Sequence, residues 1–340
     1  MTPSLATPLT EKYGLSVPIV QAGMAFVGMT PPLGIAISEA GAMGSIAGVG
    51  ILPPEAVRQL VEGVQAGTAR AFHVNFITCY TGQDHIDLMC ALRPRAVSFH
   101  WGHPTPAWIG QLHNAGVDVW EQVGSVADAQ RAVADGVDLI VAQGSEAGGH
   151  NYGTAGTLAL TPAIVDAVGD DAMVLAAGGI SDGRGLAAAL MLGADGAWIG
   201  TRFVATRESA VADEYKQRLV SAHAGDTVLT HVFGRHHPEF NPIRVLKNRV
   251  VEEWQDRVAE IPADNSSEPV IGQMDLLGQA TPLHKFANLV PMQGAEGDFE
   301  EMPLLAGQGL APITDIPAAA TIVARMADEA REALRRINGG

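Results

Sequence analysis

The stretch AQGSEAGGH, residues 142–150, presents one histidine after a run of very small residues. Alanine and glycine have little or no side chain, and glycine also adopts backbone angles closed to other residues, so such a run lets a ligand come close to the main chain. His150 then stands beside that ligand, where an imidazole acts as a general base or stabilises an anion. On placement alone, a purely structural histidine is the alternative.

Glycines also follow two later apolar runs. The stretch AAGGISDGRG contains Gly178 and Gly179, and IGTRF contains Gly200 and Thr201. Bare backbone N–H groups at such positions cradle a phosphate, helped by a helix N-terminus near Asp182. Tight turns would explain any one of these glycines, but their recurrence at two strand ends favours a phosphate-bearing ligand.

Polar side chains near other strand ends extend the predicted site. Asn75 and Gln122 each interrupt an apolar strand, and a buried amide needs a hydrogen-bond partner. These amides bond either to neighbouring backbone or to a heteroaromatic ligand, and ligand contact is the favoured interpretation. Arg184 and Arg202 stand near the glycines, where an arginine either pairs with a phosphate or forms a surface ion pair, and for both we expect the surface ion pair.

Eight short apolar runs separated by helical patterns would position these groups. The expected strands are residues 19–24, 42–48, 72–76, 96–102, 117–124, 137–144, 173–179 and 196–203. Helix caps are expected at Ser125 and Asp182. Continuously apolar strands between helices favour parallel pairing, and eight such units predict a (β/α)₈ TIM barrel of the α/β class. An open doubly wound sheet is the alternative, but no GxGxxG follows the first strand.

The pattern changes after the eighth run. Residues 1–209 are predicted to form the barrel, and residues 210–300 a smaller, mostly helical domain or lid, because no strand alternation stands out there. Residues 301–340 are expected to form a C-terminal segment whose amphipathic helix, with Val323, Met326, Ala330 and Leu334 on one face, packs back on the barrel.

Composition excludes several classes of function. The 340 residues include 21 basic and 37 acidic ones, a formal charge of −16, without a Lys/Arg cluster, so nucleic acid is not an expected partner. No secretory signal or apolar run of about 18 residues is visible, so a cytoplasmic protein without membrane contact is expected. Cys79 and Cys90 lack metal-ligand spacing and are expected to be buried thiols, with no metal site.

The motifs PIVQAGM, HVNF, VSFHWGHP, AQGSEAGGH and LAAGGISDGRGLAAALMLGADGAWIGTRF, in this order, resemble the nitronate monooxygenase family, formerly called 2-nitropropane dioxygenases. The resemblance covers residues 13–209, and the tail LLAGQGLAPITDIPAAATIVARM is similar to the family's C-terminal segment. It implies an FMN-dependent barrel that oxidises alkyl nitronates with O₂ to carbonyl compounds and nitrite, without a metal. A homodimer is among the expected states.

The resemblance also implies roles for individual residues. His150 matches the family's catalytic histidine, and the FMN phosphate is expected at Gly178, Gly179, Gly200 and Thr201. The flavin ring is expected to contact Ala22, Gly23, Met24, Asn75, Gln122, Gly148 and Gly149. Tyr152, in a loop one residue longer than the family's usual one, is expected to line the substrate pocket. Apart from the resemblance, Met292, Gln293, Gln308 and neighbouring glycines are expected to form a lid from the second domain.

Two other functions fit the same motifs. NAD(P)H-dependent flavin reductases, of the quinone or enoyl-acyl carrier protein type, carry a similar glycine–histidine loop but require a nicotinamide donor. A flavin-binding protein without turnover is the second alternative, and a histidine framed by glycines argues against it.

Overall fold

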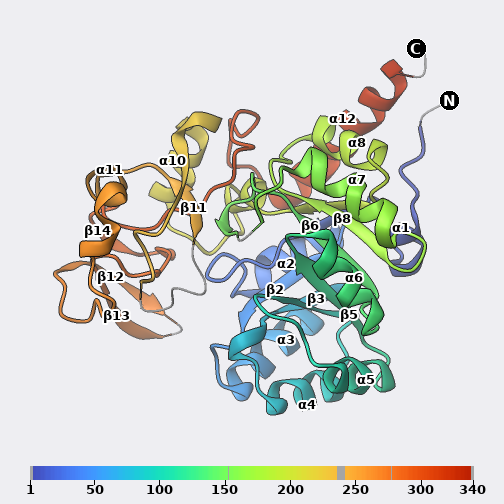
Figure 1. Ribbon diagram of the computed structural model, residues 1–340, viewed down its shortest axis with the longest axis horizontal. Coiled ribbons are helices and arrows are strands. Elements are labelled where there is room, and N and C mark those ends of the chain that lie inside the picture. Colours follow the sequence, from blue (N-terminus) through green and yellow to red (C-terminus); the bar gives the residue numbers. More distant parts are fainter. Residues whose placement is uncertain (1–2, 152, 236–241, 277, 338–340) are drawn as a thin grey trace.

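Eight parallel strands form one sheet in the order β1-β9-β8-β6-β5-β4-β3-β2. The structure is a computed structural model that describes residues 3–151, 153–235, 242–276 and 278–337. The strands are β1 (Ile19–Gln21), β2 (Gly44–Val49), β3 (Phe72–Ile77), β4 (Ala96–His100), β5 (Asp118–Val123), β6 (Leu139–Gln143), β8 (Met173–Ala177) and β9 (Gly196–Ile199). The first strand closes on the second, because the Gln21 N–H donates to the Met43 carbonyl at 2.8 Å and the Met43 N–H donates to the Ile19 carbonyl at 2.9 Å. The expected (β/α)₈ barrel is confirmed (Figure 1).

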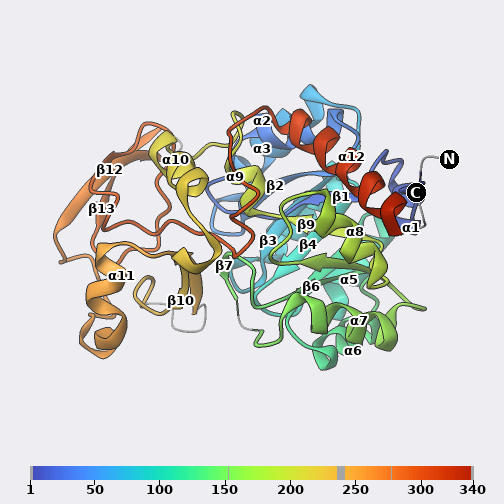
Figure 2. The same ribbon diagram turned by 90° about the horizontal axis from the view of Figure 1, so that it is seen from above.

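Helices follow the strands and surround the sheet, as Figure 2 shows from above. They are α2 (Pro31–Glu39), α3 (Pro54–Gly67), α4 (Gln83–Leu92), α5 (Pro106–Asn114), α6 (Val126–Ala134), α7 (Thr157–Val168), α8 (Gly183–Met191) and the short α9 (Thr201–Val204). The predicted caps are confirmed: the Ser125 hydroxyl accepts from the Asp128 N–H, and the Asp182 carboxylate accepts from the Gly185 N–H.

The N-terminal end of the barrel is closed by α1 (Pro8–Tyr13). The Tyr13 hydroxyl donates to the Asp118 carboxylate at 2.7 Å and accepts from the Trp120 indole N–H at 3.0 Å. Trp120 is fully buried and packs inside the barrel against Trp198. The interior is therefore filled from this end, and the opposite end, where strand C-termini meet the loops, is left to form a site.

Residues 210–300 contain more strand than the sequence predicted. Their elements are α10 (Asp213–Ser221), η2 (Ala224–Asp226), β10 (Thr227–Thr230), β11 (Ile243–Leu246), α11 (Arg249–Trp254), η4 (Gln255–Glu260), β12 (Val270–Leu276), β13 (Gln279–His284) and β14 (Glu296–Gly297). The expectation of a mostly helical domain is wrong. The antiparallel strands β12 and β13 bury Met274 and Leu283 but leave most other side chains at least partly exposed, so the alternation that marks a half-buried strand is missing.

This second region is joined to the barrel by a shared sheet. The two-residue strand β7 (Gly149–His150), in the loop after β6, pairs with β11, which pairs with β10. Both views show the region lying beside the barrel (Figures 1 and 2). The domain boundary between residues 209 and 210 stays a prediction. One hydrophobic cluster crosses it, since the cluster includes Val204 of the barrel and Val290 of the second region.

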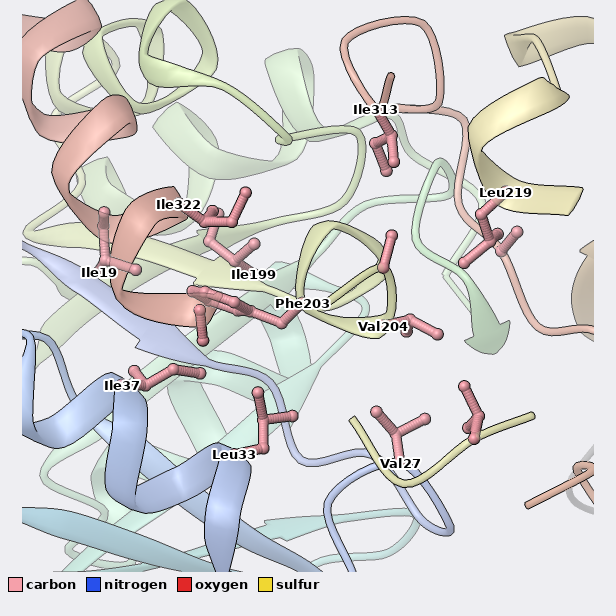
Figure 3. Close-up of a cluster of buried hydrophobic side chains, with 14 of the residues drawn as sticks. Ile19, Val27, Leu33, Ile37, Ile199, Phe203, Val204, Leu219, Ile313 and Ile322 are labelled. Carbon is pink, nitrogen blue, oxygen red and sulfur yellow. The ribbon is translucent and has the colours of Figure 1, made fainter. Parts of the chain in front are cut away.

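The last helix, α12 (Ala319–Ile337), returns to the barrel and packs on α8 and α2. Ile322, Val323 and Met326 are buried on its inner face. Figure 3 shows Phe203 of α9 lying between Ile322 and the α2 residue Ile37. This cluster fixes α9, whose first residue, Thr201, belongs to the predicted site.

The two cysteines are less buried than the sequence suggested. Cys79 is exposed and Cys90 is partly exposed. Cys79 lies in the short 3₁₀ turn η1 (Thr78–Tyr80) after β3, where its side chain is exposed, so the expectation of a buried thiol is wrong. Among the described residues, no helix has the length and apolar character needed to cross a membrane.

Candidate active site

A cavity, here called the barrel-mouth cavity, opens where the C-terminal ends of the strands meet the second region. Its wall includes His150 and every flavin-contacting residue predicted from the sequence except Asn75. These residues are Ala22, Gly23, Met24, Gln122, Gly148, Gly149, His150, Gly178, Gly179, Gly200 and Thr201. The structure thus brings together residues from five strand ends that the sequence placed far apart.

The wall needs glycine at particular positions. Gly178 and Gly179 have φ angles of +111° and +72°, in a region that favours glycine. A Cβ on Gly178 would lie 2.7 Å from Thr157 Oγ1, and one on Gly148 would lie 2.5 Å from the Gly307 nitrogen. At Gly200, by contrast, a Cβ would meet nothing closer than 3.6 Å. The loops that contain Gly148 and Gly178 therefore pack closely against neighbouring loops. Because these glycines have no side chain, their main-chain groups line the cavity.

Glu146, the carboxylate of the AQGSEAGGH stretch, has a structural role. It accepts hydrogen bonds from the Thr157 N–H at 2.8 Å and from the Thr157 hydroxyl, whose oxygen is 3.0 Å away. Thr157 Oγ1 also lies 3.0 Å from the Gly178 carbonyl oxygen. The first residue of α7 thus links the loop after β6 to the loop after β8, and Glu146 satisfies a free N–H at the start of the helix.

His150 is held from several sides. Its backbone pairs with Ile243 of β11, and its carbonyl accepts a hydrogen bond from Gln143 Nε2 at 3.0 Å. Its imidazole meets Trp101 edge-on, with ring centroids 3.9 Å apart and an interplanar angle of 86°. Asn288 Nδ2 lies 3.1 Å from His150 Nε2. The histidine is therefore a fixed group on the cavity wall, and Trp101 is an apolar neighbour that local sequence did not reveal.

Two buried polar atoms in wall residues have no hydrogen-bond partner among the described residues. They are Gln143 Oε1 and His100 Nδ1. Burial lowers the pKa of His100 to about 4, so this imidazole is neutral at neutral pH. Because buried polar atoms are nearly always paired, these orphaned atoms indicate that a polar ligand completes the wall.

Asn75 lies behind the wall. A Cβ on Gly23 would lie 2.0 Å from Asn75 Cγ, so the amide packs directly against the Gly23 backbone. Asn75 Nδ2 donates to Ser98 Oγ at 2.9 Å, and Ser98 Oγ lies 3.0 Å from His73 Nδ1. Asn75 therefore supports Gly23 from the barrel interior, and its predicted contact with the ligand would require it to act through that glycine.

The wall residues that were not predicted from the sequence include four with polar or aromatic side chains, Trp101, Gln143, Tyr215 and Asn288. Trp101 and Gln143 end apolar strands, which is a usable signal. Tyr215 and Asn288 come from the second region, where no motif marks them.

Of the predicted lid, Met292, Gln293 and Gln308 are absent from the described wall, whereas Gly307 and Gly309, the glycines on either side of Gln308, line it. Backbone pairing holds them elsewhere: the Gln293 N–H donates to the Ala210 carbonyl, and the Gln308 N–H donates to the Glu146 carbonyl. The second region and C-terminal segment instead contribute Tyr215, Asn288, Val290, Leu305, Gly307 and Gly309. Tyr152 lies outside the described residues.

The described wall contains no Lys, Arg, Asp or Glu side chain. Arg184 forms the expected surface ion pair, with Asp182. Arg202 also forms an ion pair, with the Asp315 carboxylate at 3.3 Å, but not at the surface, because its side chain is only 2% exposed. It also donates to the Asp315 carbonyl at 2.6 Å and to the Ala205 carbonyl at 2.9 Å. Its partner lies 113 residues away, which the sequence could not indicate.

Comparison with known proteins gives a consistent family. A family model described as nitronate monooxygenase matches residues 77–329. A curated protein of Mycobacterium tuberculosis, named (3aS,4S,5R,7aS)-5-hydroxy-7a-methyl-1-oxo-octahydro-1H-indene-4-carboxyl-CoA dehydrogenase, is 38% identical over 74% of this chain and 69% of its own. A probable nitronate monooxygenase of Staphylococcus saprophyticus is 30% identical over 77% of this chain and 85% of its own.

Solved structures share the whole architecture. FabK from Thermotoga maritima aligns with a TM-score of 0.80 and 30% identity, over 98% of this chain and 99% of that one. A nitroalkane oxidase from Streptomyces ansochromogenes aligns with a TM-score of 0.77 and 26% identity, over 97% and 99% of the two chains.

Proposed function

Because this chain belongs to the nitronate monooxygenase family of flavin oxidoreductases, we propose that it binds FMN in the barrel-mouth cavity and oxidises alkyl nitronates with O₂ to carbonyl compounds and nitrite. The observation that carries the proposal is the position of His150, held on the wall of a glycine-lined cavity whose described part has no ionic side chain. The nitroalkane oxidase structure is a further support.

The wall suits a flat ligand with a phosphate tail. Gly178, Gly179, Gly200 and Thr201 would hold the phosphate, and Ala22, Gly23, Met24, Gln122, Gly148 and Gly149 would contact the ring. Bare backbone at Gly200 and the close packing behind Gly178 leave main-chain groups for this purpose. When bound, FMN supplies the transfer of electrons from the substrate to O₂.

His150 has two tasks in this proposal. Protonated or hydrogen-bonding, it attracts the nitronate anion, and the chain's formal charge of −16 makes such local attraction necessary. Neutral, it takes the proton from the carbon next to the nitro group of a nitroalkane. Trp101, edge-on to the imidazole, and the strand β7 keep the ring in place while the substrate binds.

Oxidation or reduction of a thioester substrate is the second candidate. It is favoured by the identity with the M. tuberculosis CoA dehydrogenase, 38%, which exceeds the 30% with the curated nitronate monooxygenase. A cavity wall without ionic side chains among its described residues also fits a neutral acyl group.

Reduction of the bound flavin under anaerobic conditions distinguishes the candidates. The purified protein is mixed separately with an alkyl nitronate, with NADH or NADPH, and with an acyl-CoA. Loss of flavin absorbance with the nitronate alone, restored by air, is the expected result. Loss only with a nicotinamide or an acyl-CoA would replace the proposed function by the second candidate.

A further inference from the structure

Asn288 reaches His150 from a different part of the chain, 138 residues away. It lies after β13, and its side chain lines the barrel-mouth cavity. Its amide Nδ2 is 3.1 Å from His150 Nε2. The backbone of His150 is held by β11 and Gln143. The contact with Asn288 acts instead on the imidazole ring, where it affects the ring orientation and which ring nitrogen carries the proton.

The segment that carries Asn288 is itself anchored. Phe286, two residues earlier, is buried, and its ring meets Trp254 edge-on at a centroid distance of 5.0 Å. The Phe286 carbonyl accepts from the Gly234 N–H at 3.1 Å. Gly234 has a φ of +70°, and a Cβ there would lie 3.2 Å from Asn288 Cβ. The amide is therefore packed in position before any ligand binds.

We propose that Asn288 is a positioning residue that holds the His150 imidazole through a hydrogen bond at Nε2, whichever protonation state the histidine has. An amide N–H pointing at Nε2 requires a lone pair there and so favours neutral histidine. Rotating the amide by half a turn presents Oδ1 to a protonated Nε2. With Oδ1 accepting from the Nε2–H, the lone pair of neutral histidine lies on Nδ1, so the proton is taken there while the hydrogen bond at Nε2 stays in place. This inference rests on the proposed function, in which His150 gains and loses a proton.

Among the residues that the structure describes, the charged and titratable groups on the elements around β7 are bonded to other groups or are neutral. Arg244 lies on β11 opposite Gly149, and its Nε donates to the Ser145 carbonyl at 3.0 Å. Glu146, in the loop before β7, is engaged by Thr157. His100 is neutral at neutral pH, and burial raises the pKa of the Tyr215 phenol, which keeps it neutral as well.

The test compares Asn288→Asp and Asn288→Leu with the wild type, all as flavin-bound protein labelled with ¹⁵N-histidine. His150→Asn assigns the His150 signals. A carboxylate can only accept a hydrogen bond, so in Asn288→Asp we expect the Nε2 proton to be retained and the pKa of His150 to rise by about 1–3 pH units. In Asn288→Leu, which removes the amide at similar size, we expect a mixture of the two tautomers.

Activity gives the second measurement. In Asn288→Asp at pH 7, kcat/KM with a nitroalkane should fall at least about 10-fold, because the base is already protonated, while kcat/KM with preformed nitronate changes less. Unchanged His150 chemical shifts and pKa in both variants would overturn the inference. The nuclear magnetic resonance result does not require turnover, so a wild type that fails to oxidise nitronates would refute the proposed function alone.

Discussion

Replacing Gly178 by alanine tests whether close backbone packing builds the flavin site. The φ of +111° is unfavourable for alanine by about 1–2 kcal/mol. In addition, the new Cβ would lie 2.7 Å from Thr157 Oγ1 and 3.0 Å from the Ala147 nitrogen. To restore an ordinary contact of 3.4 Å, the Gly178 backbone and the Thr157 side chain must move apart by about 0.7 Å. That displacement moves the wall on which the FMN phosphate is proposed to bind.

Gly136→Ala is the matched control. Gly136 has a similar φ of +99°, but a Cβ there would meet nothing closer than 3.5 Å, and the residue lies after α6, away from the cavity. Without flavin, Gly136→Ala should lose about 1–2 kcal/mol of unfolding free energy, and Gly178→Ala should lose more because of its clash.

Only Gly178→Ala should bind FMN more weakly, by about 10- to 100-fold. This corresponds to the loss of one hydrogen bond to a charged group, about 1.5–3 kcal/mol. The assay is titration of the flavin-free protein with FMN, followed by fluorescence, beside chemical denaturation. Equal FMN affinity in Gly178→Ala, Gly136→Ala and the wild type would refute the reasoning.

Three further predictions follow from the described contacts. His150→Asn should retain FMN and lower kcat/KM for a nitroalkane by about 10²- to 10⁴-fold, and full activity would remove the histidine from the mechanism. Arg202→Met leaves two carbonyls without their buried donor and should lower the unfolding free energy, measured with denaturant, by about 1–3 kcal/mol. Arg184→Met, at an exposed ion pair, should change it by less than about 0.5 kcal/mol. Equal effects would contradict the buried role of Arg202. Burial lowers the pKa of His73 to about 4, so below pH 6.5 the unfolded chain binds a proton that the folded chain excludes, and stability should fall by up to about 1.4 kcal/mol per pH unit between pH 6.5 and 4. That decline should be shallower in His73→Gln, and parallel curves would show that His73 is not responsible.

The barrel could be predicted from the sequence because its strands are buried on both faces. Such strands are short apolar runs, and the glycines at their ends mark where a ligand meets the main chain. For this reason the predicted residues at five strand ends, from Ala22 after β1 to Thr201 after β9, lie on one cavity wall. Asn75 satisfied the same rule and faces the barrel interior as Gln122 does. Its register places it level with Trp120, two residues before Gln122, so it lies one layer deeper, behind Gly23.

Other features had no local signal. Strands β12 and β13 expose most of both faces, so nothing in their hydrophobic pattern distinguishes them from loops. Arg202 is buried only because Asp315 and its carbonyl reach it from the C-terminal segment. Asn288 meets His150 through the fold of the second region. Contacts of this kind join residues more than 100 positions apart, and a single sequence carries no record of them.

The central claim is that a nitronate donates electrons to FMN bound in the barrel-mouth cavity, with His150 beside it. The most direct measurement is the visible absorbance of the purified flavoprotein during anaerobic mixing with an alkyl nitronate, for the wild type and for His150→Asn. We expect rapid loss of the flavin band in the wild type, recovery with air, and a much slower loss in the variant. An unchanged band in the wild type, with rapid loss on adding NADPH or an acyl-CoA, would contradict the account.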